Sequence, residues 1–98
     1  MITHTVFFSL NYPNGSVDEQ NFFAEARKLA AIPGVLNFAC LKQISPKNNF
    51  DFGLSMKFAT QALYDAYTNH PDHTEFVQQN WLTGVADFME IDYEELSA

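Results

Sequence analysis

The residues most able to do chemistry lie in one short segment, Tyr67-Thr68-Asn69-His70-Pro71-Asp72-His73. This segment holds two of the three histidines of the chain, and the third, His4, lies in an apolar stretch near the amino terminus. Histidine exchanges protons near neutral pH because its unperturbed pKa is about 6.5. A phenol and an imidazole that face one pocket can therefore perform acid–base chemistry without a metal or a cofactor. Tyr67 and His73 are the candidate catalytic pair.

The same two side chains also have a structural interpretation. They could hydrogen-bond to each other or to the backbone and so fix the helical corner at Pro71. Since a buried polar group without a partner costs about 1–3 kcal/mol, such a structural pair would also be retained. His4 has two interpretations as well, because a histidine on an apolar strand is commonly a satisfied core residue. The residues alone leave these alternatives open.

Three histidines also suggest a metal site, which the spacing argues against. His70 and His73 are three residues apart with Asp72 between them, but Pro71 and the change of helix prevent a shared face. No cysteine pair or HExxH motif accompanies them. We therefore expect no metal and no cofactor. We interpret His70 as a helix-end or capping residue and the single cysteine, Cys40, as a packing residue.

Composition limits the partners of the protein. Twelve acidic residues against five basic ones give a formal charge of −7, and no basic stripe is present to bind phosphates. The same charge repels an anionic membrane surface, and no apolar run approaches the roughly 20 residues of a membrane span. The single cysteine excludes an internal disulfide and fits a reducing compartment. We expect a cytoplasmic protein that binds neither nucleic acid nor membrane.

The amino-terminal half of the chain predicts a strand followed by a helix. Residues 2–10 alternate and are rich in threonine and phenylalanine, which is typical of a strand. Ser16 and Glu19 form a capping-box pattern, so a helix should begin near Val17. The Pro33-Gly34 pair should end that segment.

The remaining residues predict two strands, a second helical region that Pro71 interrupts, and a last strand before an acidic tail. We expect these elements at residues 35–44, 50–58, 60–84 and 86–93. The order is β-α-β-β-α-β with a broken second helix, which predicts an α+β, ferredoxin-like fold in one domain over residues 1–98. The acidic residues at the end, Glu90, Asp92, Glu94 and Glu95, are interpreted as a solvated edge.

The apolar content is large for a chain of 98 residues, since 47% of them are hydrophobic and ten are phenylalanines. In the predicted fold the helices cover one face of the sheet and leave the other bare. Phe7, Phe88 and one alternating set from the second strand are candidates to cover that face by pairing with a second copy. We therefore expect a homodimer.

Five segments together indicate a relationship to a known family: His4–Leu10, Ile32–Val35, Phe50–Leu54, Tyr67–Phe76 and Ile91–Tyr93. In this order they resemble the Dabb family, the stress-response dimeric α/β-barrel domains. The resemblance spans nearly the whole chain, and the His-Pro-x-His segment is its most specific part. The resemblance implies two ferredoxin-like protomers whose bare sheet faces pack together into a barrel.

The family resemblance also implies a pocket between the sheet and the helices. One enzymatic relative, olivetolic acid cyclase, is a cofactor-free polyketide cyclase with a catalytic tyrosine and histidine at the motif positions of Tyr67 and His73, and a pocket histidine at that of His4. Two departures set this sequence apart: Phe52 replaces a third-strand histidine, and no tyrosine stands near Ala26. Cyclisation of that particular substrate is therefore not expected.

Strand and helix phase, together with the resemblance, predict the residues of the pocket. It should be an apolar site with three polar points, and its expected lining is His4, Val6, Phe8, Phe23, Phe52, Leu54, Tyr67, His73, Phe76 and Trp81. Two functions fit it. The first is a stress-associated module that binds a small hydrophobic or aromatic ligand, and the loss of the third-strand histidine favours it. The second is a cofactor-free enzyme that uses Tyr67 and His73 for acid–base chemistry.

Overall fold

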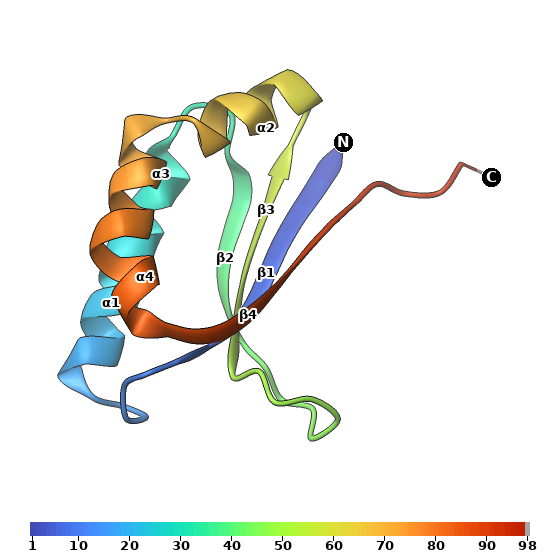
Figure 1. Ribbon diagram of the computed structural model, residues 1–98. Coiled ribbons are helices and arrows are strands. Elements are labelled where there is room, and N and C mark those ends of the chain that lie inside the picture. Colours follow the sequence, from blue (N-terminus) through green and yellow to red (C-terminus); the bar gives the residue numbers. More distant parts are fainter. Residues whose placement is uncertain (98) are drawn as a thin grey trace.

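The computed structural model describes residues 1–97, which form four strands and a set of short helices (Figure 1). In chain order the elements are β1 (Ile2–Leu10), α1 (Val17–Arg27), the 3₁₀ turn η1 (Lys28–Ala31), β2 (Leu36–Lys42), β3 (Phe52–Phe58), α2 (Gln61–Thr68), α3 (Pro71–Phe76), the π-helical turn η2 (Val77–Trp81), α4 (Leu82–Gly84) and β4 (Val85–Tyr93). The order β-α-β-β-α-β and the ferredoxin-like class are confirmed.

The four strands form one antiparallel sheet in the order β2-β3-β1-β4. All of the helices lie on the same side of this sheet, and the strand that carries the carboxyl terminus runs along its edge (Figure 1). β1 and β4 come from opposite ends of the chain and are hydrogen-bonded neighbours. Residues near both termini can therefore meet in one site.

Local hydrogen bonds fix where the two long helical segments begin. The Ser16 side chain accepts from the Glu19 amide at 3.2 Å, and the Glu19 carboxylate accepts from the Gly15 amide, which satisfies two amides at the start of α1. The Thr60 hydroxyl caps α2 by accepting from the Leu63 amide at 3.2 Å. These N-terminal caps fix where α1 and α2 begin, and so which of their side chains pack on the sheet.

The side chains that face the helices form the core. His4, Val6 and Phe8 project from β1 toward the helices and pair with Met56, Leu54 and Phe52 of β3. The most completely buried side chains of this layer are Phe8, Met56 and Phe58. The alternate apolar residues of β3 thus form its core face.

β2 interrupts its alternation with a bulge. Leu36 pairs with Lys57 and Ala39 with Ser55, so three steps along β2 match two steps along β3. Asn37 lies inside this shift with a φ of 52°, the left-handed region that asparagine tolerates better than most residues. The extra residue explains why the sequence of this strand does not alternate cleanly.

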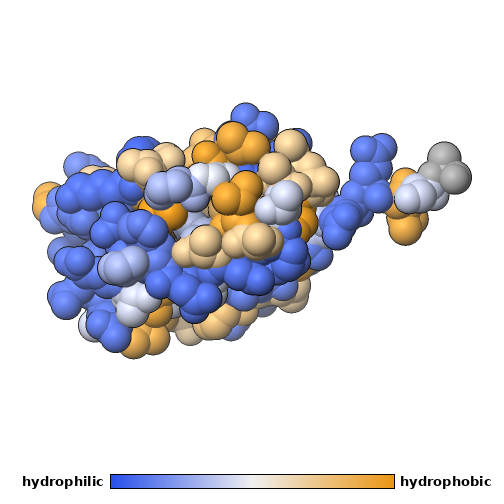
Figure 2. All heavy atoms as spheres, turned by 90° about the horizontal axis from the view of Figure 1, so that it is seen from above, coloured by the Kyte–Doolittle hydropathy of each residue, from blue (hydrophilic) through white to orange (hydrophobic). Residues whose placement is uncertain are grey.

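The opposite face of the sheet carries large apolar side chains that no helix covers. They are between 40 and 53% exposed and come from both edge strands: Leu36, Leu41, Met89, Ile91 and Tyr93. Seen from above, polar residues dominate the helix side, and hydrophobic ones gather toward the side from which the last residues extend (Figure 2). We call these five residues the bare sheet face.

The prediction that Phe88 belongs to the bare sheet face is wrong. Phe88 pairs with Phe8 across β1 and β4, and directly paired residues project to the same side of a sheet. Its side chain therefore faces the helices, whereas its neighbour Met89 faces away. None of the helices within residues 1–97 has the length and apolar character needed to cross a membrane.

Candidate functional site

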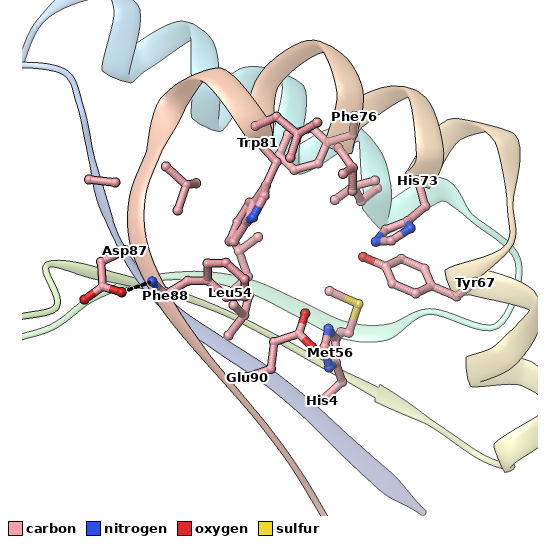
Figure 3. Close-up of a pocket in the computed structure, with 16 residues that line it drawn as sticks. His4, Leu54, Met56, Tyr67, His73, Phe76, Trp81, Asp87, Phe88 and Glu90 are labelled. Carbon is pink, nitrogen blue, oxygen red and sulfur yellow. Dashed lines mark hydrogen bonds between the residues drawn. The ribbon is translucent and has the colours of Figure 1, made fainter.

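A cavity of about 440 Å³ lies between the sheet and the helices that follow α2 (Figure 3). Pockets that bind small molecules are commonly about 300–1,000 Å³, so this one has the volume for a small organic ligand. Its lining comes from β1, η1, β3, the helical segments α2 to α4 and β4. The lining residues are His4, Val6, Leu29, Leu54, Met56, Tyr67, His73, Phe76, Val77, Trp81, Leu82, Val85, Ala86, Asp87, Phe88 and Glu90.

Tyr67 and His73 lie side by side at the polar end of this cavity (Figure 3). Tyr67 belongs to the last turn of α2 and His73 to the first turn of α3, and Pro71 starts the new helix between them. Their ring centroids are 4.6 Å apart with the planes inclined by 49°. The proline break therefore places both side chains at one void.

The hydrogen bond of His73 fixes which ring nitrogen carries the proton. The Nδ1 atom lies 3.0 Å from the Thr68 carbonyl oxygen, and a carbonyl can only accept, so Nδ1–H is the donor. Burial lowers the pKa of His73, and nearby His4 lowers it further, against opposing contributions from the Thr68 carbonyl and Glu90. At neutral pH the ring is therefore uncharged and its Nε2 lone pair is free to accept a proton.

Tyr67 is the complementary donor. Its side chain is only 3% exposed, yet no group in the described part of the chain hydrogen-bonds to its hydroxyl, which faces the cavity. Burial raises the pKa of the Tyr67 phenol, and the negative charge of Glu90 raises it further. The phenol therefore keeps its proton at neutral pH and presents it to whatever occupies the void.

A second polar cluster lies beneath the cavity and joins β1, α2 and β4. His4 Nδ1 is 2.5 Å from Asp92 Oδ1, and the Tyr64 hydroxyl donates to Asp92 Oδ2 at 2.7 Å. The Tyr64 oxygen also lies 2.9 Å from His4 Nδ1. Since Tyr64 gives its own proton to the carboxylate, its oxygen can accept from the same Nδ1–H. Every polar atom of the cluster then has a consistent role.

This cluster orients the buried imidazole of His4. With Nδ1–H donated to Asp92 and Tyr64, Nε2 is the ring nitrogen left without a partner among the described residues, and His4 lines the cavity. The Tyr64 ring stacks on Phe58 at 5.0 Å with the planes 6° apart, which holds its hydroxyl in place. Burial raises the pKa of Tyr64, with a further contribution from its hydrogen bond to Asp92, so it remains a donor.

The acidic segment lies on the exposed edge strand β4, as expected, but two of its residues also make specific contacts. Glu90 lines the cavity and Asp92 binds His4. The sequence carried a signal for this, because Phe88, Glu90 and Asp92 are two residues apart and so share one strand face. What it lacked was the antiparallel register between β1 and β4, which pairs His4 with Asp92.

The predicted apolar lining divides into two groups. Val6, Leu54, Phe76 and Trp81 line the cavity, together with the three polar points His4, Tyr67 and His73. Phe8, Phe23 and Phe52 do not line it. They form an aromatic cluster near α1, in which the Phe8 ring lies 6.1 Å from that of Phe23 and 6.0 Å from that of Phe52.

The interpretation of His70 as a capping residue agrees with the structure. Its Nδ1 accepts from the Asp72 amide at 3.1 Å at the start of α3. His70 and His73 are thus each engaged with the backbone, and residues 1–97 hold no group of three or more His, Cys, Asp or Glu side chains suited to a metal ion. Cys40 is half-buried in β2, where burial raises the pKa of its thiol against the opposing charge of Arg27.

Fold and cavity together define a ferredoxin-like α+β protein with a pocket between its sheet and its helices. The chain belongs to the Dabb family, because residues 2–95 match the family model of the stress responsive A/B barrel domain. No curated protein sequence matches the chain.

Three solved structures illustrate the similarity. A Dabb family protein with a ferredoxin-like fold from Mesorhizobium loti is 48% identical, with a TM-score of 0.96 over 98% of this chain and 97% of that one. A dimeric ferredoxin-like protein of unknown function from Thermobifida fusca is 24% identical, with a TM-score of 0.76 over 94% and 88%. The hydroxynitrile lyase of Passiflora edulis is 15% identical, with a TM-score of 0.82 over 94% and 90%. The latter two likenesses concern the fold alone.

Proposed function

We propose that this protein is a cytoplasmic homodimer of single-domain chains, each of which binds a small apolar or aromatic ligand in the cavity. The observation that carries the proposal is the Tyr67 hydroxyl, which belongs to a largely buried residue, opens onto the void and has no hydrogen-bond partner among the described residues. No buried polar side-chain atom of the described residues lacks a partner, so this hydroxyl is open to the cavity, where a ligand oxygen can accept its proton. Aromatic and aliphatic side chains supply the remaining walls.

The dimer is supported by the bare sheet face. Five large apolar side chains gathered on one uncovered surface mark a site of protein association. The ferredoxin-like protein from Thermobifida fusca, which has the same fold, is described as dimeric. Pairing through these sheet faces would leave the helices, and the cavity beneath them, on the outside of the pair.

Ligand binding can be measured at the only tryptophan of the chain, Trp81, which lines the cavity. We expect 2-naphthylmethanol to shift the single indole N–H resonance of Trp81 saturably in a two-dimensional NMR titration. Tyr67→Phe should weaken this binding about three- to tenfold, because one hydrogen bond is worth about 0.5–1.5 kcal/mol.

The matched control is Tyr12→Phe, which removes the same hydroxyl from a tyrosine outside the cavity lining. It should leave the dissociation constant unchanged. A titration in which the Trp81 resonance does not move, up to the solubility of the compound, would contradict the binding proposal. Equal effects of the two substitutions on the dissociation constant would show that the Tyr67 hydroxyl does not contact the ligand.

A second function, cofactor-free acid–base catalysis, is favoured by the proton arrangement at the cavity. His73 Nε2 could take an α-proton from an enolisable carbonyl compound, while the Tyr67 hydroxyl hydrogen-bonds to the developing enolate oxygen. The proton would then return to the carbon from the imidazolium. The hydroxynitrile lyase of Passiflora edulis supports this candidate only as evidence that the fold can carry an enzyme.

The catalytic candidate predicts exchange of the methyl protons of acetophenone with solvent deuterium, followed by NMR. The rate should fall as the pH drops through the pKa of His73, which is below its ordinary value, so the acidic limb should lie below about pH 6.5. His73→Gln should lower the exchange rate by about a hundredfold or more and should abolish the fall in rate at acidic pH. A rate in the wild type equal to that of buffer would exclude this candidate and leave the binding proposal untouched.

A further inference from the structure

The polar groups of the cavity are mostly hydrogen-bond acceptors. His73 spends its Nδ1 proton on the Thr68 carbonyl, which leaves Nε2 of its uncharged ring as an acceptor. Glu90 adds a carboxylate next to His4 in the same wall (Figure 3). A ligand that fills this end of the cavity must therefore bring hydrogen-bond donors of its own.

The protein supplies few donors in return. Tyr67 has its hydroxyl, and the indole N–H of Trp81 belongs to the same lining. None of the residues that line the cavity is a lysine or an arginine. A carboxylate or phosphate would thus find one phenol and one indole to donate to its oxygens, and no positive charge to offset its own.

The charges around the cavity act in the same direction. Glu90 raises the pKa of Tyr67 and acts to raise that of His73, so its negative charge reaches both side chains. Asp87 adds a second carboxylate to the lining, and the whole chain has a formal charge of −7. An anion entering the cavity would meet this field without compensation, whereas a cation would be attracted.

We propose that the ligand of this cavity is an uncharged or cationic aromatic compound that carries hydrogen-bond donors, a hydroxyl or an ammonium group, and that aromatic carboxylates and phosphates are excluded. This inference rests on the proposed binding function and names its ligand class. A hydroxyl group fits well because it can donate to His73 and accept from Tyr67. An ammonium group can donate to His73 and to Glu90.

The test compares three probes that share one ring system and differ in charge: 2-naphthylmethanol, 2-naphthylmethylamine and 2-naphthoate. Each is titrated into the wild-type protein at low salt and neutral pH, with the Trp81 indole resonance as the readout. We expect the alcohol and the amine to bind, and the carboxylate to bind at least about tenfold more weakly than the amine.

Glu90→Gln removes the charge and keeps the shape of the side chain. Because Glu90 is solvent-exposed, the expected effect is about threefold: weaker binding of the amine, tighter binding of the carboxylate and no change for the alcohol. Glu94→Gln is the matched control, since it makes the same charge change outside the cavity lining and should alter none of the three.

The outcomes separate this inference from the function on which it rests. Carboxylate binding as tight as amine binding, or equal effects of Glu90→Gln and Glu94→Gln, would overturn the ligand class while small-molecule binding stands. Failure of all three probes to move the Trp81 resonance would overturn the binding function itself and the ligand class with it.

Discussion

Ile91→Asp is expected to convert the proposed homodimer into monomers. Ile91 lies in the second half of β4 on the bare sheet face, opposite Thr5 of β1. In a dimer formed through this face, the substitution would bury a carboxylate from each copy without a partner, at a cost of several kcal/mol. The dissociation constant should rise at least about a hundredfold. Light scattering coupled to size exclusion should report two 11.1 kDa chains for the wild type and one for the variant.

The control is Val17→Asp, an equal change at an exposed valine in the first turn of α1, on the helix side of the sheet. It should keep the mass of the wild type. Thermal melting of both variants at one protein concentration would separate dissociation from unfolding. A wild-type protein that elutes as a single chain at micromolar concentration would remove the dimer, and the bare sheet face would need another partner.

The elements of the fold could be predicted because their signals are local. Ser16 with Glu19, Thr60 and Pro71 fix the starts of α1, α2 and α3 within a few residues of the chain. Several boundaries differed: the second strand is Leu36–Lys42 rather than 35–44, the third begins at Phe52 rather than Phe50, and the last begins at Val85 rather than at residue 86. The first helix also tightens into a 3₁₀ turn after Arg27. All of these are ends of elements, where the local pattern is weakest.

Parts of the site could not be predicted because they depend on register and on helix phase. The π-helical turn η2 adds a residue to the turn that carries Trp81, so Trp81 lines the cavity while Asn80 lines a different groove against α1. The contact of His4 with Asp92 joins residues 88 positions apart. No spacing within the sequence could align those two positions before the strand pairing was known.

Strand register also explains two wrong assignments. The sequence predicted Phe8 in the pocket lining and Phe88 on the dimer face, but Phe88 lines the cavity and Phe8 does not. Phe8 and Phe88 are directly paired, yet Phe8 is fully buried and Phe88 is 51% exposed at the cavity wall. The difference comes from β4 being an edge strand, which the helices cover less completely than β1. The sequence does not distinguish the two phenylalanines. The order of the strands in the sheet does, because it places Phe8 in the core and Phe88 at the cavity wall.

Phe8→Ala is therefore expected to destabilise the protein far more than Phe88→Ala. The Phe8 ring lies 5.1 Å from that of Trp81 and 5.6 Å from that of Phe22, so its removal would leave a void between the sheet, α1 and η2. The expected loss of unfolding free energy is about 3–5 kcal/mol for Phe8→Ala. For Phe88→Ala it is about 1 kcal/mol, since half of that side chain already meets solvent.

Urea unfolding at one fixed protein concentration checks this difference, with an unchanged slope required for the comparison. If Phe8→Ala does not fold, Phe8→Leu keeps the test open, because it retains most of the volume and should cost about 1–2 kcal/mol. The two positions should also exchange order in ligand binding: Phe88→Ala should weaken the binding of 2-naphthylmethanol, and Phe8→Leu should not, since only Phe88 lines the cavity. Equal stability losses at both positions would mean that Phe88 is covered in the assembled protein, which would place the partner chain over the cavity mouth as well as over the bare sheet face.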